Sequence, residues 1–526
     1  MPCTEGTGMA VERRWRLRTG IVVMLAASSL VVLAPAMAED LPAYVLDLPQ
    51  TTVSGISSGA FMAVQFGTAH AATISGVAAT AGGPYFCAGR DSWAGSGVGK
   101  VMARCMQGDP SYPAQPITDI NLSDMHAAAR AWSARGLNDD LSNLQRQRVW
   151  IFHGYNDGIV KRPVSDALHA WYAGLVPETQ IFYKNELRAA HAQISASCAD
   201  ASGAACNPCA TTGGTFINSC PDGDAGAPTY DAAGAALQLF YGPLARSASA
   251  SLKGQVREFD QRPFIQRGGQ PLNPIRASMA DTGYLYVPAD CAAGEACRLH
   301  VAFHGCEQQA GLIGKDFVTR AGFNEWADAN RIVVLYPQTA ATSAVPITPF
   351  NPKGCWDWWG YTDFGYDMPG HYATRDGVQI SAIWRMVEKL ASGGAGRVAP
   401  VATQMPDLRV VDRSADQIAL AWTPVAGAAG YRIYRGEGAD AGVGSVMHAV
   451  TAVTVDGPSW VDRGLQPQTT YRYLVCAVDA SGTEGLSSAQ LMVSTGATPP
   501  ACDPYFSLAK DRVVGRNNRP TSAVCP

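Results

Sequence analysis

Apolar residues along the first three quarters of the chain alternate between strand-like runs and helix-like spacing. Four short apolar runs have the composition of buried strands and lie at 148–153, 179–183, 300–303 and 331–336. Apolar positions three or four residues apart predict helices between them, at 164–173, 320–330 and 378–391. Strands separated by helices predict a mostly parallel sheet covered on both faces, and therefore an α/β fold over residues 39–395.

Beyond the α/β region the pattern changes to short alternating strands without helices. These strands are expected at 417–422, 431–435, 459–462 and 470–475. About 90 residues of this kind predict an all-β sandwich over 405–497. Residues 396–404, which follow a Gly-rich turn, are expected to form a linker. Residues 498–526 form a tail closed by Cys502 and Cys525 that is too short to hold a core of its own.

Residues 1–38 have the three parts of a secretory signal peptide. Four arginines between positions 13 and 18 precede an apolar run at 21–33, and Ala36-Met37-Ala38 has the small residues of a cleavage site. The apolar run is short for a membrane-spanning helix, and the Ala-Met-Ala sequence argues against an uncleaved anchor. We therefore expect a secreted protein without a stable membrane anchor, released to the medium or to the periplasm.

Composition and charge narrow the function classes further. The formal net charge is -4, whereas a nucleic-acid-binding protein is expected to carry an excess of basic residues, so this function class is disfavoured. The 14 cysteines, all but Cys3 outside the signal sequence, predict disulfides in an exported chain. Cys206 and Cys209 have no second pair and no histidines at ligand spacing, so a structural bridge is favoured over a zinc site or a redox-active pair. No metal ion and no organic cofactor is expected.

The segment Gly55-Ile56-Ser57-Ser58-Gly59 fits the pattern Gly-x-Ser-x-Gly. It follows an extended run at 51–53 and precedes a helix-like run at 60–66. A strand, a tight turn and a helix in this order hold a serine oxygen above a sheet, as in the nucleophile elbow of α/β-hydrolases. In a chain with 54 glycines the pattern can also arise by chance, and its context favours the functional interpretation. We expect Ser57 to be a nucleophile and the Ser58 N–H to be an oxyanion donor.

A serine nucleophile needs a base to take its proton and a third group to orient that base. Asp157 lies just past the strand-like run 149–153, and His191 follows the next run, 181–183. Loops after strands are where α/β-hydrolases carry these groups. Ser57, Asp157 and His191 also occur in the chain order that such triads have.

Other polar residues fit these roles less well. His153 lies within a strand-like run, and His126 and His169 lie on helix-like stretches, so structural roles are favoured for all three. Asp200 is the alternative acid, but it follows His191, which is the wrong order.

His304-Gly305-Cys306 follows the run 300–303 and looks like the His-Gly oxyanion loop of lipases and esterases. That loop normally precedes the nucleophile, and here it lies far downstream of Ser57. A circularly permuted hydrolase explains the order, because neighbouring chain ends can be joined and the chain cut elsewhere without changing the site. The Cys306 N–H would then join the Ser58 N–H as a second oxyanion donor.

Together these segments resemble the extracellular poly(3-hydroxybutyrate) depolymerases that have a circularly permuted α/β-hydrolase domain. The matching segments are 53–63, 81–87, 282–288, 300–306 and 354–358. The resemblance spans nearly all of residues 45–392. It implies Ser57 as the nucleophile, Asp157 as the acid, His191 as the base and the Cys306 N–H in the oxyanion hole. It also implies a polyester polymer or oligomer as the substrate.

The same resemblance implies a disulfide framework. Its pairs are Cys87–Cys105, Cys198–Cys220, Cys291–Cys297 and Cys306–Cys355. The remaining cysteines are expected to pair as Cys206–Cys209 and Cys502–Cys525.

The predicted sandwich resembles a fibronectin type III module through Trp422 and the stretch from Leu465 to Tyr471. In this family such a module commonly joins the catalytic domain to a C-terminal polymer-binding domain. Here only the Cys502–Cys525 tail stands in that place. The departure weakens the expectation of tight adsorption to solid polymer, but not that of ester hydrolysis.

Trp356, Trp358 and Trp359 form an aromatic cluster beside Cys355 and are candidates for substrate binding. Three tryptophans in four positions are more than one strand face can bury, so at least one is expected to face a cleft. Trp356 is expected to be a wall of a substrate subsite, with a core position as the alternative.

The expected reaction is two-step acyl transfer on a secreted polyester. Two other functions stay open from the sequence. One is a secreted carboxylesterase acting on soluble oligomers or on feruloyl or acetyl esters of plant walls. The other is a non-catalytic surface-binding protein in which the sandwich is the working part.

Overall fold

A computed structural model describes most of the chain after its first 38 residues. The described residues are 39–89, 97–106, 117, 119–198, 206–223, 227–343, 349–363, 370–393, 406–425, 428, 430–438, 447–450, 457–478 and 484–497. The predicted signal peptide, the linker, the tail with its Cys502–Cys525 pair, and Asp200 lie outside the described residues. Among the residues that are described, no helix has the length and apolar character to cross a membrane.

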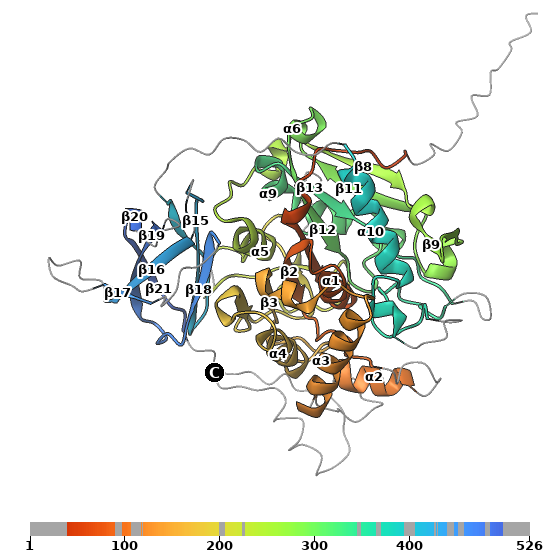
Figure 1. Ribbon diagram of the computed structural model, residues 1–526, viewed down its shortest axis with the longest axis horizontal. Helices are drawn as coiled ribbons and strands as arrows, with labels where there is room; N and C mark the ends of the chain where they lie inside the picture. Colours follow the sequence, from red (N-terminus) through yellow and green to blue (C-terminus); the bar gives the residue numbers. More distant parts are fainter. Residues whose placement is uncertain are drawn as a thin grey trace, which may run out of the picture. The chain divides into compact units, whose positions relative to one another are not determined.

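An eight-stranded sheet organises the α/β region, in the order β4-β3-β2-β1-β12-β13-β11-β8 (Figure 1). The strands are β1 (Thr51–Ile56), β2 (Ile74–Thr80), β3 (Arg148–Phe152), β4 (Ile181–Lys184), β8 (Gln255–Asp260), β11 (Thr282–Val287), β12 (Arg298–Phe303) and β13 (Ile332–Tyr336). All neighbours from β4 to β13 are parallel, and at one edge β11 pairs antiparallel with both β13 and β8. The mostly parallel sheet predicted from the sequence is confirmed.

Strands β1 and β12 are parallel neighbours at the centre of this sheet, although they are far apart in the chain. Gly55 of β1 pairs in register with Phe303 of β12. Because the carboxyl ends of parallel strands meet at one edge, the turn after β1 lies beside the loop after β12. This adjacency agrees with the circular permutation inferred from the sequence.

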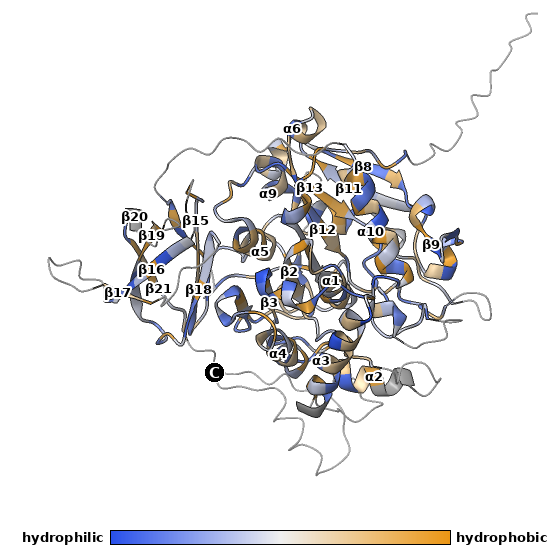
Figure 2. Cartoon of the chain, viewed as in Figure 1, coloured by the Kyte–Doolittle hydropathy of each residue, from blue (hydrophilic) through white to orange (hydrophobic). Residues whose placement is uncertain are grey.

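Side chains along each strand alternate between two apolar cores, as the two-residue period of a strand requires. In β3, Val149 and Ile151 enter one core, while Trp150 and Phe152 enter the other. The first core is covered by α1 (Ser58–Ala69), α3 (Asp119–Ala134), α4 (Arg162–Ala173) and α10 (Val378–Ala391). The second is covered by α5 (Ala232–Tyr241), α8 (Asp316–Arg320) and α9 (Asn324–Ala329). Figure 2 shows the apolar character of the strands between these helices.

Short elements fill the connections. The helices are α2 (Gly97–Cys105), α6 (Ala289–Ala292) and α7 (Ala310–Ile313). A small sheet joins β5 (Gln193–Ile194), β7 (Ile217–Ser219) and β6 (Asn207–Pro208), and a two-stranded ribbon joins β9 (Gln266–Arg267) to β10 (Gln270–Pro271).

The C-terminal β region forms two sheets, as the alternating pattern predicts. One sheet has the order β14-β15-β18, and in the other β16 and β19 pair with β17, β20 and β21. The strands are β14 (Leu408–Arg413), β15 (Gln417–Trp422), β16 (Gly430–Glu437), β17 (His448–Ala449), β18 (Ser459–Arg463), β19 (Thr470–Val478), β20 (Glu484–Ser487) and β21 (Leu491–Ser494). Trp422, Ile433 and Tyr473 are fully buried between the sheets.

The sandwich contacts β4, the edge strand of the large sheet. The Gln417 side chain donates to the Tyr183 carbonyl at 2.9 Å and accepts from the Tyr183 N–H at 3.5 Å, so it pairs with the free edge of the strand. The buried Lys184 ammonium lies 3.5 Å from the Asp412 carboxylate, which also accepts from the Tyr230 hydroxyl. An exposed sheet edge invites unwanted pairing, and these polar contacts cover part of it.

The disulfides agree with the sequence prediction at three pairs and differ at two. Cys87–Cys105, Cys291–Cys297 and Cys306–Cys355 are present as expected. The predictions Cys198–Cys220 and Cys206–Cys209 are wrong, because the structure pairs Cys198 with Cys206 and Cys209 with Cys220. The two residues between Cys206 and Cys209 form strand β6. Three residue steps along an extended strand span about 10 Å, beyond the reach of one disulfide.

Candidate active site

Ser57 occupies a strained turn between β1 and α1. Its backbone has φ 55° and ψ -123°, a left-handed conformation that side-chain-bearing residues rarely adopt. The flanking glycines are required by space. A Cβ on Gly55 would lie 2.1 Å from the Gly59 carbonyl oxygen, and a Cβ on Gly59 would lie 2.4 Å from that of His304. This is the geometry expected of a nucleophile elbow.

Asp157 and His191 form a buried hydrogen-bonded pair on the loops after β3 and β4. Asp157 Oδ2 accepts from His191 Nδ1 at 2.7 Å, while Oδ1 accepts from the backbone N–H groups of Ile159 and Val160. Burial by itself would raise the pKa of Asp157, but the charge and hydrogen bond of His191 outweigh it and lower the pKa of this carboxyl. The ionised Asp157 therefore holds the proton on Nδ1 and leaves Nε2 of His191 as the acceptor.

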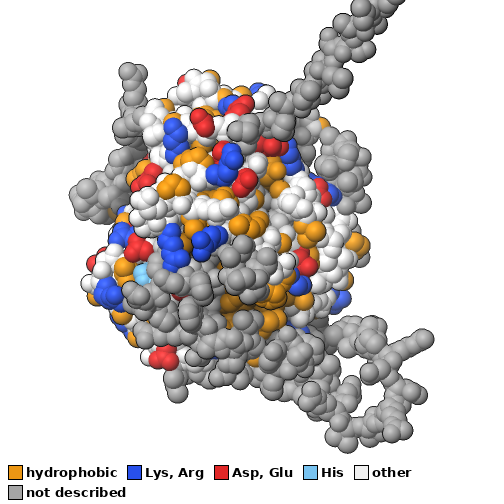
Figure 3. Space-filling model, turned by 90° about the vertical axis from the view of Figure 1, so that its right-hand side faces the viewer, with side chains coloured by type: hydrophobic (Ala, Val, Ile, Leu, Met, Phe, Trp, Pro, Cys, Tyr) orange, Lys and Arg blue, Asp and Glu red, His pale blue; other side chains and the backbone are white. Residues whose placement is uncertain are grey.

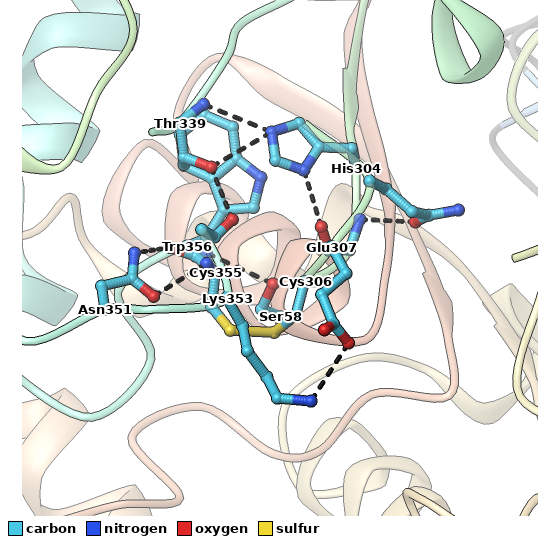
Figure 4. The surroundings of a disulfide bond; sticks show 12 residues. Ser58, His304, Cys306, Glu307, Thr339, Asn351, Lys353, Cys355 and Trp356 are labelled. Carbon is cyan, nitrogen blue, oxygen red and sulfur yellow. Dashed lines mark hydrogen bonds and ion pairs between the residues drawn. A yellow bond between two sulfur atoms is a disulfide. The ribbon is translucent and has the colours of Figure 1, made fainter. Parts of the chain in front are cut away.

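The predicted oxyanion loop, which begins at His304 after β12 and includes Cys306 and Glu307, is braced by the segment that contains Cys355 (Figure 4). The Cys306–Cys355 disulfide joins the two segments, the Glu307 N–H donates to the Lys353 carbonyl at 2.8 Å, and the side chains of the same two residues pair at 3.1 Å. Glu307 itself has a left-handed φ of 60°. The loop thus keeps a strained shape because several independent contacts determine it.

His304 fixes the start of this loop from inside. Its Nδ1 donates to the Gly305 carbonyl at 2.7 Å, and its Nε2 accepts from the Thr339 N–H at 3.3 Å (Figure 4). Burial lowers the pKa of His304 to about 4, so the neutral imidazole that this bonding pattern requires is the form present near neutral pH.

Two backbone N–H groups near Ser57 are left for a ligand. Within the described part of the chain, we find no protein acceptor for the amide of Ser58 or for that of Cys306. Their elements meet at this point, since a Cβ on Gly305 would lie 3.4 Å from Cβ of Ser57. Two unused donors beside a serine on a helix N-terminus can stabilise an oxyanion.

The other histidines weighed from the sequence have structural partners. His153 Nε2 donates to the Val160 carbonyl at 2.9 Å, and burial lowers the pKa of this imidazole. His169 contacts the Glu178 carboxylate at 3.0 Å. His126 stacks on the Trp171 ring at a centroid distance of 5.7 Å. These partners agree with the structural roles favoured for all three residues.

Comparison with known proteins identifies the relatives of this chain. A poly(3-hydroxybutyrate) depolymerase of Delftia acidovorans is 37% identical over 459 residues, which cover 86% of this chain and 80% of the relative. A polyhydroxybutyrate depolymerase of Talaromyces funiculosus is 32% identical over 370 residues, covering 69% of this chain and 96% of that protein.

This chain belongs to the poly(3-hydroxybutyrate) depolymerase family. Solved structures agree, among them the PHB depolymerase of Penicillium funiculosum and a serine-to-alanine variant of a PHB depolymerase complexed with an R3HB trimer. Each is 32% identical to this chain and has a TM-score of 0.54. The matched region covers 67% of this chain and 99% of the solved chain. No protein-family model matches the chain.

The tryptophan cluster of this depolymerase-family chain differs from the sequence prediction. Trp356 is fully buried, and its ring packs on Phe303 and His304. Trp358 is also buried and stacks on Phe61 at 5.0 Å. Trp356 therefore takes the core position that was the alternative, and it is not a wall of an open substrate subsite. The disulfide brings the segment beside the oxyanion loop as expected, but the ring turns into the core. Trp359, which is partly exposed, stays a candidate for substrate contact.

Two residues that this depolymerase family member places beside the candidate site were not predicted from the sequence. Phe216 lies edge-on to the His191 ring at a centroid distance of 6.2 Å, and Gln308 bonds to Gly305 of the oxyanion loop. Phe216 lies two residues after Gly214 within a cysteine-bounded loop, which carries no recognisable motif. Gln308 has one local signal, since it is three residues beyond Gly305 and can reach back to its N–H as a capping side chain does.

Proposed function

We propose that this protein is a secreted serine esterase that hydrolyses poly(3-hydroxybutyrate) or related short-chain polyhydroxyalkanoates to oligomers and monomers. Family membership supports the reaction and the polymer class. The observation that carries the assignment of residues is the 2.7 Å bond between His191 and Asp157, on loops at the same sheet edge as the strained Ser57 turn.

The first half of the reaction forms an acyl-enzyme. His191 Nε2 takes the proton of the Ser57 hydroxyl, and Oγ attacks the ester carbonyl carbon. The carbonyl oxygen gains negative charge and accepts from the Ser58 and Cys306 N–H groups. His191 then gives its proton to the leaving hydroxyl end of the polymer, and the ester bond breaks. Asp157 keeps the imidazole in the productive tautomer throughout.

The second half releases the acid and restores the serine. Water enters, His191 removes one of its protons, and the hydroxide attacks the acyl carbonyl carbon in the same oxyanion site. Collapse of the tetrahedral species breaks the bond to Ser57 Oγ, which regains a proton from His191. Every proton is carried by residues of the chain, so the scheme needs no metal or organic cofactor.

The proposed substrate is an uncharged aliphatic polyester, so the distribution of apolar and charged side chains on the protein surface affects how the polymer approaches the site. On the face drawn in Figure 3, apolar side chains alternate with charges of both signs. Trp359 is proposed to contact the polyester substrate near the oxyanion loop. Secretion is proposed from the N-terminal sequence and supported by five disulfides among the described residues, since such bonds persist in oxidising compartments.

The deciding experiment compares the purified mature protein with Ser57→Ala on a suspension of amorphous poly(3-hydroxybutyrate). We expect the wild type to release 3-hydroxybutyrate and its oligomers and Ser57→Ala to release none. Ser75→Ala, whose hydroxyl donates to the Thr51 carbonyl on β1, is the matched control and should behave as the wild type.

Three contrary results have different meanings. Ser57-dependent cleavage of p-nitrophenyl butyrate or feruloyl esters, without release from the polymer, would retain the esterase and reject the polymer assignment. Equal activity of the wild type and Ser57→Ala would reject the nucleophile. A wild type that hydrolyses no ester would favour the surface-binding alternative.

A further inference from the structure

The Gln308 side chain is buried between the oxyanion loop and a second loop that lies against His191. Its Oε1 accepts from the Gly305 N–H at 2.7 Å. Its Nε2 donates to the carbonyls of Thr215 and Phe216 at 2.9 and 3.1 Å. Only 1% of the residue is exposed. Both donors and the oxygen of the amide are therefore used, and they join segments that are distant in the chain.

The loop on the far side of this bridge supports both flanks of His191. We call residues 206–220 the clamp loop. The Ala190 N–H donates to the Cys209 carbonyl at 2.9 Å, and the Gln193 N–H donates to the Phe216 carbonyl at 2.9 Å. The Phe216 ring stands edge-on to the imidazole, and Phe216 has a left-handed φ of 52°.

Two disulfides hold the clamp loop in place. Cys209–Cys220 closes it, and Cys198–Cys206 ties its start to the segment after β5. The carbonyls that Gln308 contacts are thus part of a braced element. A hydrogen bond to an element that is itself held in place restricts the position of Gln308 more than a bond to a free loop would.

On the near side, the bridge fixes the N–H of Gly305, the residue that precedes Cys306. Gln308 holds the Gly305 N–H, and His304 holds the Gly305 carbonyl at 2.7 Å. The first bond lies on the His304–Gly305 peptide and the second on the Gly305–Cys306 peptide, so Gly305 is held at both ends and the plane of the Gly305–Cys306 peptide is fixed. That plane determines where the Cys306 N–H points, and this group is the oxyanion donor in the proposed function.

We propose that Gln308 is a positioning residue that couples the oxyanion loop to the clamp loop, so that the Cys306 N–H and the His191 imidazole keep one mutual geometry. The inference rests on the proposed function and adds to it a residue that touches neither substrate nor reacting atoms. An amide is required here because one end must accept from an N–H while the other donates to two carbonyls. A carboxylate would face the two carbonyls without a donor, and a thioether would satisfy neither side.

The test measures Gln308→Met and Gln308→Glu on p-nitrophenyl butyrate, with active-site titration to correct for misfolded protein. Gln147→Met is the matched control, because Gln147 is equally buried and its Nε2 also donates to two backbone carbonyls, those of Gly67 and Ile74. We expect Gln308→Met to lower kcat about tenfold to a hundredfold, with KM changed less than about twofold, since misplaced catalytic groups affect mainly the chemical step. Gln147→Met should lower Tm similarly and leave kcat unchanged.

Two further readouts separate positioning from stability. For Gln308→Glu, activity relative to the wild type should rise as the pH falls, because the protonated acid regains one donor. The effect of Gln308→Met should also be smaller in a Phe216→Ala background, because that variant keeps the carbonyl that Gln308 contacts but removes the ring that stands against His191.

The inference is overturned if kcat per active site is the same for Gln308→Met and Gln147→Met, or if the Gln308 and Phe216 effects multiply. These outcomes leave the proposed function intact, provided that wild-type hydrolysis depends on Ser57. A wild type without Ser57-dependent hydrolysis removes the proposed function itself, and the inference with it.

Discussion

His191 Nδ1 donates to Asp157 Oδ2 across 2.7 Å, and this bond joins the loops after two neighbouring strands, β3 and β4. Both side chains are buried, with 5% and 4% of Asp157 and His191 exposed. The second oxygen of Asp157 is occupied by two backbone N–H groups. The carboxylate therefore cannot rotate away, and the imidazole keeps one tautomer.

Replacing Asp157 by asparagine should lower kcat on p-nitrophenyl butyrate by about 10³ to 10⁴. The amide can still accept from the Ile159 and Val160 N–H groups, so its NH₂ would face His191 and force the wrong tautomer. The measurement is kcat together with Tm, and Tm is expected to change little. Asp290→Asn, at an exposed carboxylate 3.7 Å from Arg331, is the control and should keep full activity. Retained activity in Asp157→Asn would reject Asp157 as the orienting acid.

Removal of the Cys306–Cys355 disulfide should reduce both stability and catalysis. The bond closes a loop with a sequence separation of 49, and loop-closure entropy predicts a loss of about 4 kcal/mol in the free energy of unfolding. Because the bond also braces the oxyanion loop, Cys306→Ser with Cys355→Ser should lower kcat even where the protein is folded. Denaturant unfolding and single-turnover kinetics measure the two effects.

The matched control removes Cys291–Cys297, whose separation is 6 and which lies away from the site. Its loss should cost about 2 kcal/mol and leave kcat per folded molecule unchanged. Equal kcat losses in the two double variants would contradict the bracing role of Cys306–Cys355.

The pairing of the four cysteines around the clamp loop can be read directly from peptides. Cleavage before Asp200 and after Phe216 yields the segment 200–216, which contains Cys206 and Cys209. With the pairs Cys198–Cys206 and Cys209–Cys220, this segment stays bound to both neighbouring peptides without reduction. Non-reducing mass spectrometry should find the three peptides linked. A free 200–216 peptide with an internal bridge would instead restore the pairing expected from the sequence.

Acid should destabilise the protein through His304. Burial lowers the pKa of this imidazole to about 4, whereas an unfolded histidine has a pKa near 6.5. Between these values the unfolded state binds more protons, so stability is fully present above about pH 6.5 and is lost as the pH falls toward 4. The contribution is at most about 3 kcal/mol. Urea unfolding should therefore find that His304→Gln is much less stable than the wild type at pH 7, with a smaller difference at pH 4.5. A difference that does not depend on pH would contradict this origin.

Several features could be predicted because they depend on residues that are close together in the sequence. The Ser57 turn needs glycines at Gly55 and Gly59, and both lie within the same five-residue segment. Asp157 and His191 could be placed because each follows a recognisable strand, and parallel strands bring their carboxyl ends to one edge. The sandwich followed from alternation alone, since a period of two residues is a local property of a strand.

Other features depend on distances between segments that no local pattern encodes. The spacing of Cys206 and Cys209 suggests a bridge, and the extended strand between them prevents it. Trp356 lies beside the oxyanion loop as expected, but packing on Phe303 decides that its ring faces the core. Gln308 meets Phe216 only because β12 and the clamp loop converge at one sheet edge. Local sequence thus determined which chemistry the chain carries, while tertiary packing decided which side chains meet, because contact energies act across space and not along the chain.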